Sequence, residues 1–211
     1  MSPVDAPLSL DRIVSAAEDV IRRFGPAKAT VVDVARTLGV SHAAVYRHVA
    51  TKAELRDLVV GRWAETIMPT LRAIAARPGP APKRLRQFFD ALIEVKRRRA
   101  AEDPELFAAY RTLAADAQSV VAAHLDELVR LAATVIRSGV GEGTFRAVDP
   151  VVASRAVLFA TSKFHHPAHA AEWADPGIDA AFDDVWQMLM NGLCVEKSTR
   201  QNSKQRRRQT P

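Results

Sequence analysis

The chain has 211 residues, of which 48% are hydrophobic and 26% are charged, and it contains a single cysteine, Cys194. This length suffices for one or two domains with a sizeable core, and the composition is typical of a soluble globular protein. One cysteine excludes an intramolecular disulfide and a zinc site built from several thiolates. No run approaches the roughly 20 apolar residues of a transmembrane helix, and the polar N-terminus lacks the apolar segment of a signal peptide. We therefore expect a cytoplasmic protein with no membrane partner.

The net charge of +6 is concentrated at the C-terminal end of the sequence. Beyond residue 196 lie six of the 30 basic residues and no acidic residue, which leaves 24 basic and 24 acidic residues in the remainder. The body is thus formally neutral, so a basic composition is weak evidence for nucleic-acid binding. We expect residues 197–211 to form a disordered, solubilising tail. The alternative is a tail that adds non-specific affinity for phosphate.

Apolar residues recur at helical spacing along the chain, and no convincing alternating pattern of a β-strand is present. The sequence therefore predicts an all-α protein. A first helix ends at Gly25-Pro26. Its apolar stripe consists of Leu10, Ile13, Val14, Ala17, Ile21 and Phe24.

Residues 30–52 carry the signals of two short helices joined by a tight turn, with another helix directly after them. Thr30 and Asp33 form a capping box, and Gly39 permits the left-handed conformation that such a turn requires. Ser41 is suited to cap the second short helix. This pattern predicts the helix-turn-helix of DNA-binding proteins over residues 29–48. An ordinary helical hairpin is the alternative.

The following helix begins with a second capping box at Thr51 and runs toward residue 76, with a kink or interruption at Pro69. A break rich in proline and glycine follows at residues 77–83. We interpret the basic run at residues 96–99 as a solvated last helical turn. Further helices are predicted at about 83–99, from Asp103 onward, and at about 117–139, 149–164 and 178–195. Gly139, Gly141 and Gly143 are expected to close the helix at about 117–139.

These elements predict an N-terminal helix-turn-helix domain over residues 1–52, with the helix of about 51–76 as a connector. A larger helical domain is expected over residues 77–196. The helix at 149–164 is apolar almost all round, which suggests that it is covered on two sides. The helix at 178–195 carries one apolar stripe and has little left to pack on except the preceding helix and a second copy of itself. We expect them to form a two-fold symmetric homodimer. The candidate interface residues are Val152, Phe182, Val185, Trp186, Leu189 and Leu193.

From Asp11 to about Glu65, about a quarter of the chain, the sequence resembles the TetR family of bacterial transcriptional repressors. The resemblance rests on DRIVSAAEDVIRRFG, TVVDVARTLGVSHAAVYRHV and TKAELRDLVV. It implies an N-terminal three-helix DNA-binding domain and a larger C-terminal helical domain for ligand binding and dimerisation. It also implies a homodimer that binds double-stranded DNA and releases its operator when a small-molecule effector binds. Neither a cofactor nor enzymatic activity is expected.

The resemblance also implies which residues contact DNA. Some residues are expected to contact the phosphate backbone of DNA, either through a hydroxyl, ammonium or ring group or through a helix N-terminus, which favours an anion. They are Thr30, Ser41, Tyr46, His48 and Lys52. Base contacts fall to the outward residues His42, Ala43, Ala44 and Arg47. The two alanines offer only apolar contacts, for instance to a thymine methyl, so specificity rests on His42, Arg47 and DNA shape. A partly buried Tyr46 ring and an ordinary surface Lys52 are the alternatives.

An effector pocket is expected among the predicted helices between about residues 83 and 164, and its apolar character suggests a hydrophobic or aromatic effector. At helical spacing most of the candidate residues also suit a plain core. They are Phe88, Phe89, Phe107, Tyr110, Val121, His124, Leu128, Phe159 and Phe164.

Three histidines within five residues, His165, His166 and His169, are weak candidate metal ligands, with His124 as a further one. Pro167 interrupts the helix there, so contacts in a pocket or an interface are the alternative. A metal-dependent hydrolase or metal sensor is therefore one competing function, and a sequence-indifferent DNA binder using the basic tail is another. No HExxH motif, nucleophile–base pair or glycine-rich phosphate loop supports catalysis.

Overall fold

A computed structural model describes residues 7–28 and 30–195 of the chain. Over these residues the secondary structure is helical, apart from one isolated β-bridge between Phe145 and Cys194. The prediction of an all-α fold is confirmed. The predicted tail at 197–211 and most of the N-terminal segment lie outside the described residues. No helix in the described ranges combines the length and apolarity needed to cross a membrane.

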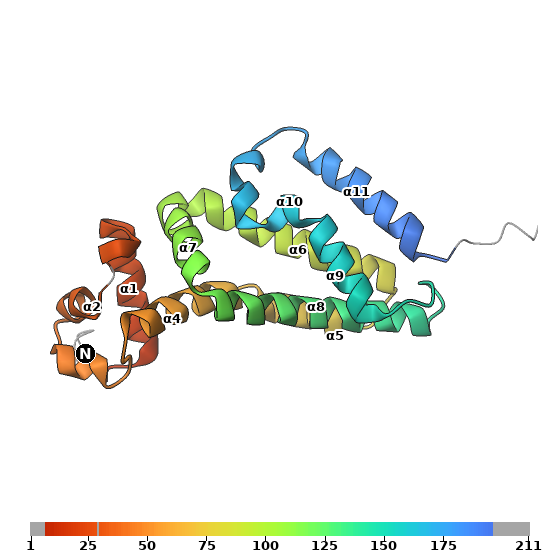
Figure 1. The fold of residues 1–211 in the computed structure, drawn as a ribbon. Coiled ribbons are helices and arrows are strands. Elements are labelled where there is room, and N and C mark those ends of the chain that lie inside the picture. Colours follow the sequence, from red (N-terminus) through yellow and green to blue (C-terminus); the bar gives the residue numbers. More distant parts are fainter. Residues whose placement is uncertain (1–6, 29, 196–211) are drawn as a thin grey trace, which may run out of the picture.

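The first helices form a compact group at one end of the molecule (Figure 1). They are α1 (Leu10–Phe24), the short 3-10 helix η2 (Pro26–Lys28), α2 (Val31–Leu38), α3 (His42–Tyr46) and α4 (Lys52–Glu65). Helix α1 packs against α2 and α4 through Ile13 and Ala17, which are fully buried. The predicted stripe is corrected at its two ends, because Leu10 and Phe24 are exposed there.

The predicted interruption near Pro69 is present and falls one turn earlier. Helix α4 ends at Glu65, and α5 (Met68–Ala76) starts with Pro69 in its first turn. Proline has no N–H to donate to the carbonyl four residues before it, and its ring collides with that turn. In the first turn of a new helix the missing N–H costs nothing. Pro69 therefore ends one helix and begins the next.

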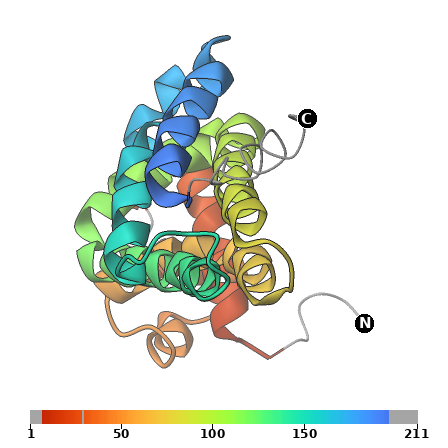
Figure 2. The same ribbon diagram turned by 90° about the vertical axis from the view of Figure 1, so that its right-hand side faces the viewer.

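The C-terminal helices assemble around α8, which contacts α4, α5, α6 and α9 (Figure 1). Helices α5 and α6 also pack against each other and lie on one side of α8, with α9 on the other (Figure 2). Helix α11 lies at the far side of this assembly (Figure 1). The bounds are α6 (Ala81–Glu102), α7 (Pro104–Asp116), α8 (Gln118–Gly141), α9 (Pro150–Ala160), α10 (Ser162–His165), η3 (Pro167–Glu172) and α11 (Ile178–Leu193).

The predicted single helix over 149–164 is divided at Thr161 into α9 and α10. The buried Thr161 hydroxyl donates to the carbonyl of Val157 at 2.8 Å, four residues before it. Such back-bonding bends a helix. The chain therefore changes direction at Thr161, which places the following histidines beside α6.

Two hydrophobic clusters fill the fold. The larger one lies among α5, α6, α8, α9, α10 and α11, with Phe88, Phe89 and Phe164 almost fully buried. The smaller one contains the cores of α1–α4, and it also includes Phe107 and Tyr110 of α7. Helix α7 thus contributes to the N-terminal core, although it follows α6 in the C-terminal assembly.

Gly139 lies inside α8, which continues to Gly141, so the prediction that Gly139 closes the helix is wrong. A Cβ built on Gly139 would lie 2.2 Å from the Phe145 ring and 2.8 Å from Cβ of Ala81. The absent side chain therefore lets the Phe145 ring pack directly on the helix backbone. Gly143 does have the left-handed φ of 67° expected of a residue that ends a helix.

Replacing Gly139 by alanine should lower the free energy of unfolding by about 1–3 kcal/mol, because the new methyl group overpacks the site against Phe145. Urea denaturation followed by circular dichroism measures the change. Gly141→Ala is the matched control, since nothing lies within 4 Å of its Cβ position. Equal midpoints for the two variants would contradict this account of Gly139.

Candidate functional site

The helix-turn-helix is held by hydrogen bonds within its own backbone and caps. The Thr30 hydroxyl accepts from the Asp33 N–H at 3.2 Å and donates to the Asp33 carboxylate at 2.5 Å. Gly39 adopts φ 67° and ψ 29°, and Ser41 Oγ accepts from the Ala44 N–H at 3.2 Å. Val45 is fully buried against the rest of the motif. The local signals in the sequence therefore produce the turn that they predict.

The predicted DNA-contacting side chains fall into two groups in the structure. His42, Ala43, Tyr46 and Arg47 are exposed, while Ala44 and His48 are half-buried. Tyr46 is 49% exposed, so it is partly covered by the protein and still reachable from solvent. Within the described chain the side chains of His42, Tyr46, Arg47 and His48 form no hydrogen bond or ion pair, so they are free to bind a partner.

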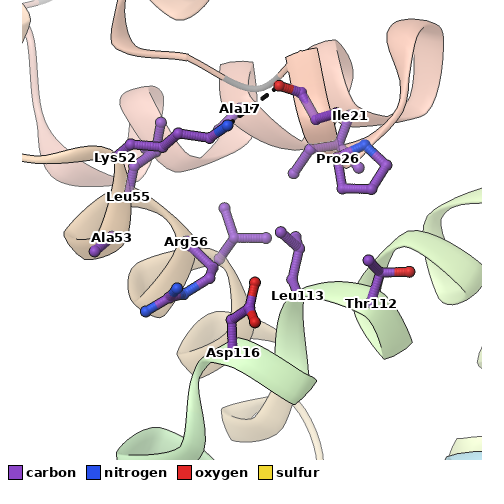
Figure 3. Close-up of a pocket in the computed structure, with 12 residues that line it drawn as sticks. Ala17, Ile21, Pro26, Lys52, Ala53, Leu55, Arg56, Thr112, Leu113 and Asp116 are labelled. Atoms are coloured by element: carbon purple, nitrogen blue, oxygen red, sulfur yellow. Dashed lines mark hydrogen bonds between the residues drawn. The ribbon is translucent and has the colours of Figure 1, made fainter.

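Thr30 and Lys52 are already engaged inside the protein. The Thr30 hydroxyl both donates a hydrogen bond to Asp33 and accepts one from it. The Lys52 ammonium donates to the Ala27 carbonyl at 3.2 Å, the bond dashed in Figure 3. For either side chain to reach phosphate, this internal hydrogen bond would have to be exchanged for the new contact.

Lys52 also lines a crevice of about 500 Å³ between the N-terminal helices and α7 (Figure 3). One wall consists of residues from α1, η2 and α4, among them Ile21 and Leu55. The opposite wall is the C-terminal half of α7, with Thr112, Leu113 and Asp116. The crevice leaves unfilled space directly between α7 and the helices that carry the helix-turn-helix.

A second cavity, of about 600 Å³, lies on the other side of α7, bounded by α6, α7, α8 and α10. Thr112 lines both cavities. Of the residues predicted to line an effector pocket, Tyr110, Val121, His124 and Leu128 lie in its wall. No aspartate or glutamate is among the described residues that line it.

The predicted phenylalanines do not line this cavity, and that part of the pocket prediction is corrected. Phe88, Phe89 and Phe164 fill the larger core, and Phe107 lies in the smaller one. The Phe159 ring is 64% exposed on the outside of α9. Apolar residues at helical spacing mark a buried face, and close packing among α6, α8, α10 and α11 occupies most of that face.

Lys96, on α6, is the one lysine in the cavity wall, and sequence reasoning placed it in solvent. Its side chain is buried, with 5% of the residue exposed. The ammonium lies 4.4 Å from the centroid of the Trp63 ring and forms no hydrogen bond or ion pair with any described residue. Burial, and secondarily the charge of Arg99, lowers the pKa of Lys96 to about 8. The prediction of a solvated basic turn is thus wrong at its first residue.

The helical period contains the signal that identifies Lys96. It follows Leu92 by four residues and Phe89 by seven, so it continues the inward stripe of α6. Four consecutive basic residues concealed this register. Of the other three, Arg97 pairs with Asp179 at 2.5 Å and Arg98 is exposed.

The lowered pKa values of His124 and His165 keep these two side chains of the cavity wall neutral at pH 7. Burial lowers the pKa of His124 to about 4 and that of His165 to about 3, and in both cases the Lys96 charge lowers it further. The pKa of His166 is also lowered, mainly by burial. Nε2 of His124 is buried without a hydrogen-bond partner, and Nε2 of His165 lies 3.2 Å from the Thr161 hydroxyl.

The predicted metal ligands point to different surroundings. Nδ1 of His166 accepts from the Ala168 N–H at 3.2 Å, while Nδ1 of His169 lies 2.9 Å from the Glu172 carboxylate. His165 is buried against Thr161. Among the described residues, no group of three or more histidine, cysteine, aspartate or glutamate side chains is arranged to hold a metal ion.

Most of the predicted dimer-interface residues of α11 face inward. Phe182, Trp186 and Leu193 are buried in the larger core, and this part of the interface prediction is corrected. Trp186 packs against Phe89 of α6 with ring centroids 5.6 Å apart. Val185 and Leu189 are half-buried at the edge of that core. Val152 of α9 is 67% exposed, and Met188 of α11 is 77% exposed.

The fold and these sites define a class of protein, namely a helix-turn-helix DNA-binding regulator with a cavity in a larger C-terminal helical domain. The family model described as "Bacterial regulatory proteins, tetR family" matches residues 13–59. The model described as "Tetracyclin repressor-like, C-terminal domain" matches residues 81–186, half of the chain. The chain belongs to the TetR family of transcriptional regulators.

Solved structures with the same fold extend over nearly the whole chain. SmeT, the repressor of a multidrug efflux pump of Stenotrophomonas maltophilia, is 18% identical, with a TM-score of 0.67 over 93% of this chain and 94% of its own. A TetR transcription regulator from Haloarcula marismortui is 20% identical, with a TM-score of 0.68 over 88% of this chain and 98% of its own.

FadR of Bacillus subtilis, in complex with stearoyl-CoA, is 14% identical, with a TM-score of 0.62 over 87% of this chain and 99% of its own. At these identities the likeness shows the shared fold alone. A comparison with curated protein sequences gives no significant match.

The burial of Lys96 makes a prediction about stability and pH. Between pH 8 and 10.5 the folded chain releases the Lys96 proton while the unfolded chain keeps it, so the stability of the wild type should rise with pH in this range. Below pH 8 the charged ammonium is buried at full cost. Lys96→Met should therefore raise the thermal midpoint of unfolding at neutral pH, by roughly 2–4 °C for each kcal/mol of added unfolding free energy. The difference in midpoint between this variant and the wild type should shrink toward pH 10.

Scanning calorimetry of the two proteins at several pH values measures this difference. Lys83→Met, at an exposed position of the same helix, is the control and should give a difference that does not depend on pH. A Lys96→Met difference that stays constant from pH 7 to 10 would contradict the burial of a charged ammonium.

Proposed function

We propose that the chain is a ligand-responsive repressor that binds a near-palindromic operator as a homodimer and leaves it when a small effector occupies the C-terminal cavity. The observation that carries this proposal is the helix-turn-helix, with its backbone fixed internally and its outer side chains unpaired. As a regulator of transcription it would act in the cytoplasm, together with the DNA. We propose no enzymatic role.

On this proposal the outer surface of α3 enters the major groove. His42 and Arg47 offer the hydrogen bonds to base edges, while Ala43 and Ala44 allow close approach and apolar contact. Tyr46 and His48 position the motif on the phosphate backbone, as do Ser41, Thr30 and Lys52 where their internal bonds are exchanged. With so few polar base readers, DNA shape and the spacing of two half-sites contribute much of the specificity.

His42→Ala should reduce the affinity for a selected operator by about 1 kcal/mol or more, roughly fivefold, and broaden the preference at one base pair of each half-site. Selection from a random DNA library, followed by titration at fixed salt, measures both effects. His169→Ala, a histidine change in the C-terminal part of the chain, should leave the site preference unchanged. An identical preference profile for His42→Ala and the wild type would remove His42 from base readout.

A homodimer is supported by large apolar side chains that α9 and α11 leave uncovered. Val152 and Phe159 are seven residues apart, hence on one face of α9, and both are about two-thirds exposed. Met188 is the most exposed large apolar residue of α11. We therefore propose an interface around Val152, Phe159 and Met188, with Val185 and Leu189 at its edge. Two-fold symmetry would then set two α3 helices about one turn of DNA apart, roughly 34 Å.

Phe159→Asp should dissociate the dimer, because a carboxylate buried unpaired in an apolar interface costs about 3 kcal/mol or more, over a hundredfold in the dissociation constant. Light scattering during size-exclusion chromatography measures the mass. Phe24→Asp is matched in residue type and exposure, at 65% against 64%, and lies on α1, so it should remain dimeric. A wild type that is monomeric at micromolar concentration would refute the dimer itself.

The response to an effector is supported by the position of α7. This helix separates the 600 Å³ cavity from the crevice beside the N-terminal helices, so unfilled space lies on both of its sides. Its Tyr110 stacks on Trp63 of α4 with ring centroids 3.8 Å apart. The preceding residue, Arg62, donates to the Ser15 hydroxyl at 2.7 Å and to the Asp11 carbonyl at 2.8 Å, both on α1. A shift of α7 would therefore reach the DNA-binding helices through α4.

A further inference from the structure

We propose that the cavity between α6, α7, α8 and α10 binds an amphipathic organic acid, with the carboxylate against the Lys96 ammonium and the apolar body against Leu92, Val121 and Leu128. This inference rests on the proposed function, because it names the chemical class of the effector at the same site. It also changes the expectation of a purely hydrophobic effector.

The unpaired charge of Lys96 is the first argument. A buried ammonium normally has an acidic partner or several hydrogen bonds, since desolvation otherwise costs several kcal/mol. Lys96 has neither within the described chain, and its one favourable contact is the face of the Trp63 ring at 4.4 Å. A cation held unpaired in a cavity wall is complementary to an anion that is not part of the protein.

The other polar groups of the cavity strengthen the preference for an anion. The exposed Arg111 adds a second, solvent-screened positive charge at the wall, and no acidic residue is among the described lining residues to offset it. His124 lies in the same wall, and its buried Nε2 has no hydrogen-bond partner. A cationic ligand would meet uncompensated repulsion there. A neutral apolar ligand would displace water from the Lys96 ammonium without forming a hydrogen bond or ion pair to replace it.

The apolar part of the cavity wall indicates that the remainder of the ligand is apolar. Leu92, Val121, Leu125 and Leu128 line one connected surface from α6 to α8, within a volume suited to a small molecule. A single buried ammonium balances one negative charge. A monovalent carboxylate on an alkyl or aryl body therefore fits better than a free inorganic anion or a polyphosphate, which would leave the apolar wall unfilled.

The binding test uses the full-length protein without DNA and two matched ligand series. Decanoate, decanamide and decylamine share one skeleton, and 4-phenylbutyrate with its amide provides an aromatic one. Isothermal titration at neutral pH should show at least one carboxylate binding about tenfold or more tightly than its amide, the amount expected of a charge-assisted contact. Binding should also change tryptophan fluorescence, and Trp63→Phe should abolish that change.

Lys96→Met should remove the preference for carboxylate over amide, and Lys96→Arg, which keeps the charge, should retain most of it. Because Lys96→Met is expected to be the more stable protein without ligand, a loss of carboxylate binding is distinguishable from unfolding. Equal affinities for carboxylate and amide in both ligand series would overturn the proposal. So would the absence of binding by both carboxylates below about 1 mM, or an unchanged preference in Lys96→Met.

A separate measurement distinguishes this inference from the proposed function. Electrophoretic mobility shifts with a selected operator test whether the protein binds specific DNA and whether a bound carboxylate releases it. Carboxylate binding that depends on Lys96 without release of DNA would uphold the ligand class and refute the effector mechanism. Specific DNA binding with no carboxylate binding would uphold the repressor and refute the ligand class.

Discussion

The stack of Trp63 on Tyr110 is the contact on which both candidate sites depend. It joins α4 to α7 with ring centroids 3.8 Å apart, and Phe107 closes the same group at 5.7 Å from Trp63. The neighbouring Arg62 holds the other face of α4 to α1 through Ser15 and Asp11. Helix α4 is thus fixed on one face to the DNA-binding helices and on the other to the wall of the cavity. On the proposed function, a movement of α4 would therefore involve both the helix-turn-helix and the cavity wall.

The burial of Lys96 against this stack is unfavourable for folding and informative about function. Cation–π contact with Trp63 returns part of the desolvation cost, but the lowered pKa of Lys96 shows that the charged form remains penalised. A leucine or methionine at the same position on α6 would extend the apolar core without this cost. Residues that break a local rule in this way concentrate at functional sites, where a partner outside the chain compensates for them.

The helix-turn-helix could be predicted from the sequence because its determinants are local. The Thr30 and Ser41 caps and the left-handed Gly39 each act within four residues, and each adopts the predicted role. The end of α4 before Pro69 follows from the same kind of short-range sterics. These features depend little on which distant helix packs against the motif.

The cavity and the proposed dimer surface could not be predicted in the same way, because both depend on which helices meet. The sequence predicts the apolar stripe of α11, but its most buried residues pack within the same chain, with Trp186 against Phe89 of α6. Phe159 has the aromatic side chain expected of a pocket residue, but it lies exposed on the surface of α9. Lys96 has the charged side chain expected of a surface residue, but it is buried in the cavity wall. Amphipathic periodicity identifies a face that will be buried and leaves its partner undefined.

On the proposed function, the division of free space around α7 offers a route by which a small ligand would act at a distance in a close-packed protein. Packed cores resist gradual deformation, so a ligand shifts the element that loses the fewest contacts when it moves. Helix α7 borders a cavity on one side and a crevice on the other, with Thr112 lining both. Because Tyr110 is carried on that helix, any displacement toward the crevice moves the ring on which Trp63 rests. On the proposed function, the unfilled crevice beside the DNA-binding helices would therefore belong to the regulatory site together with the cavity proposed to receive the ligand.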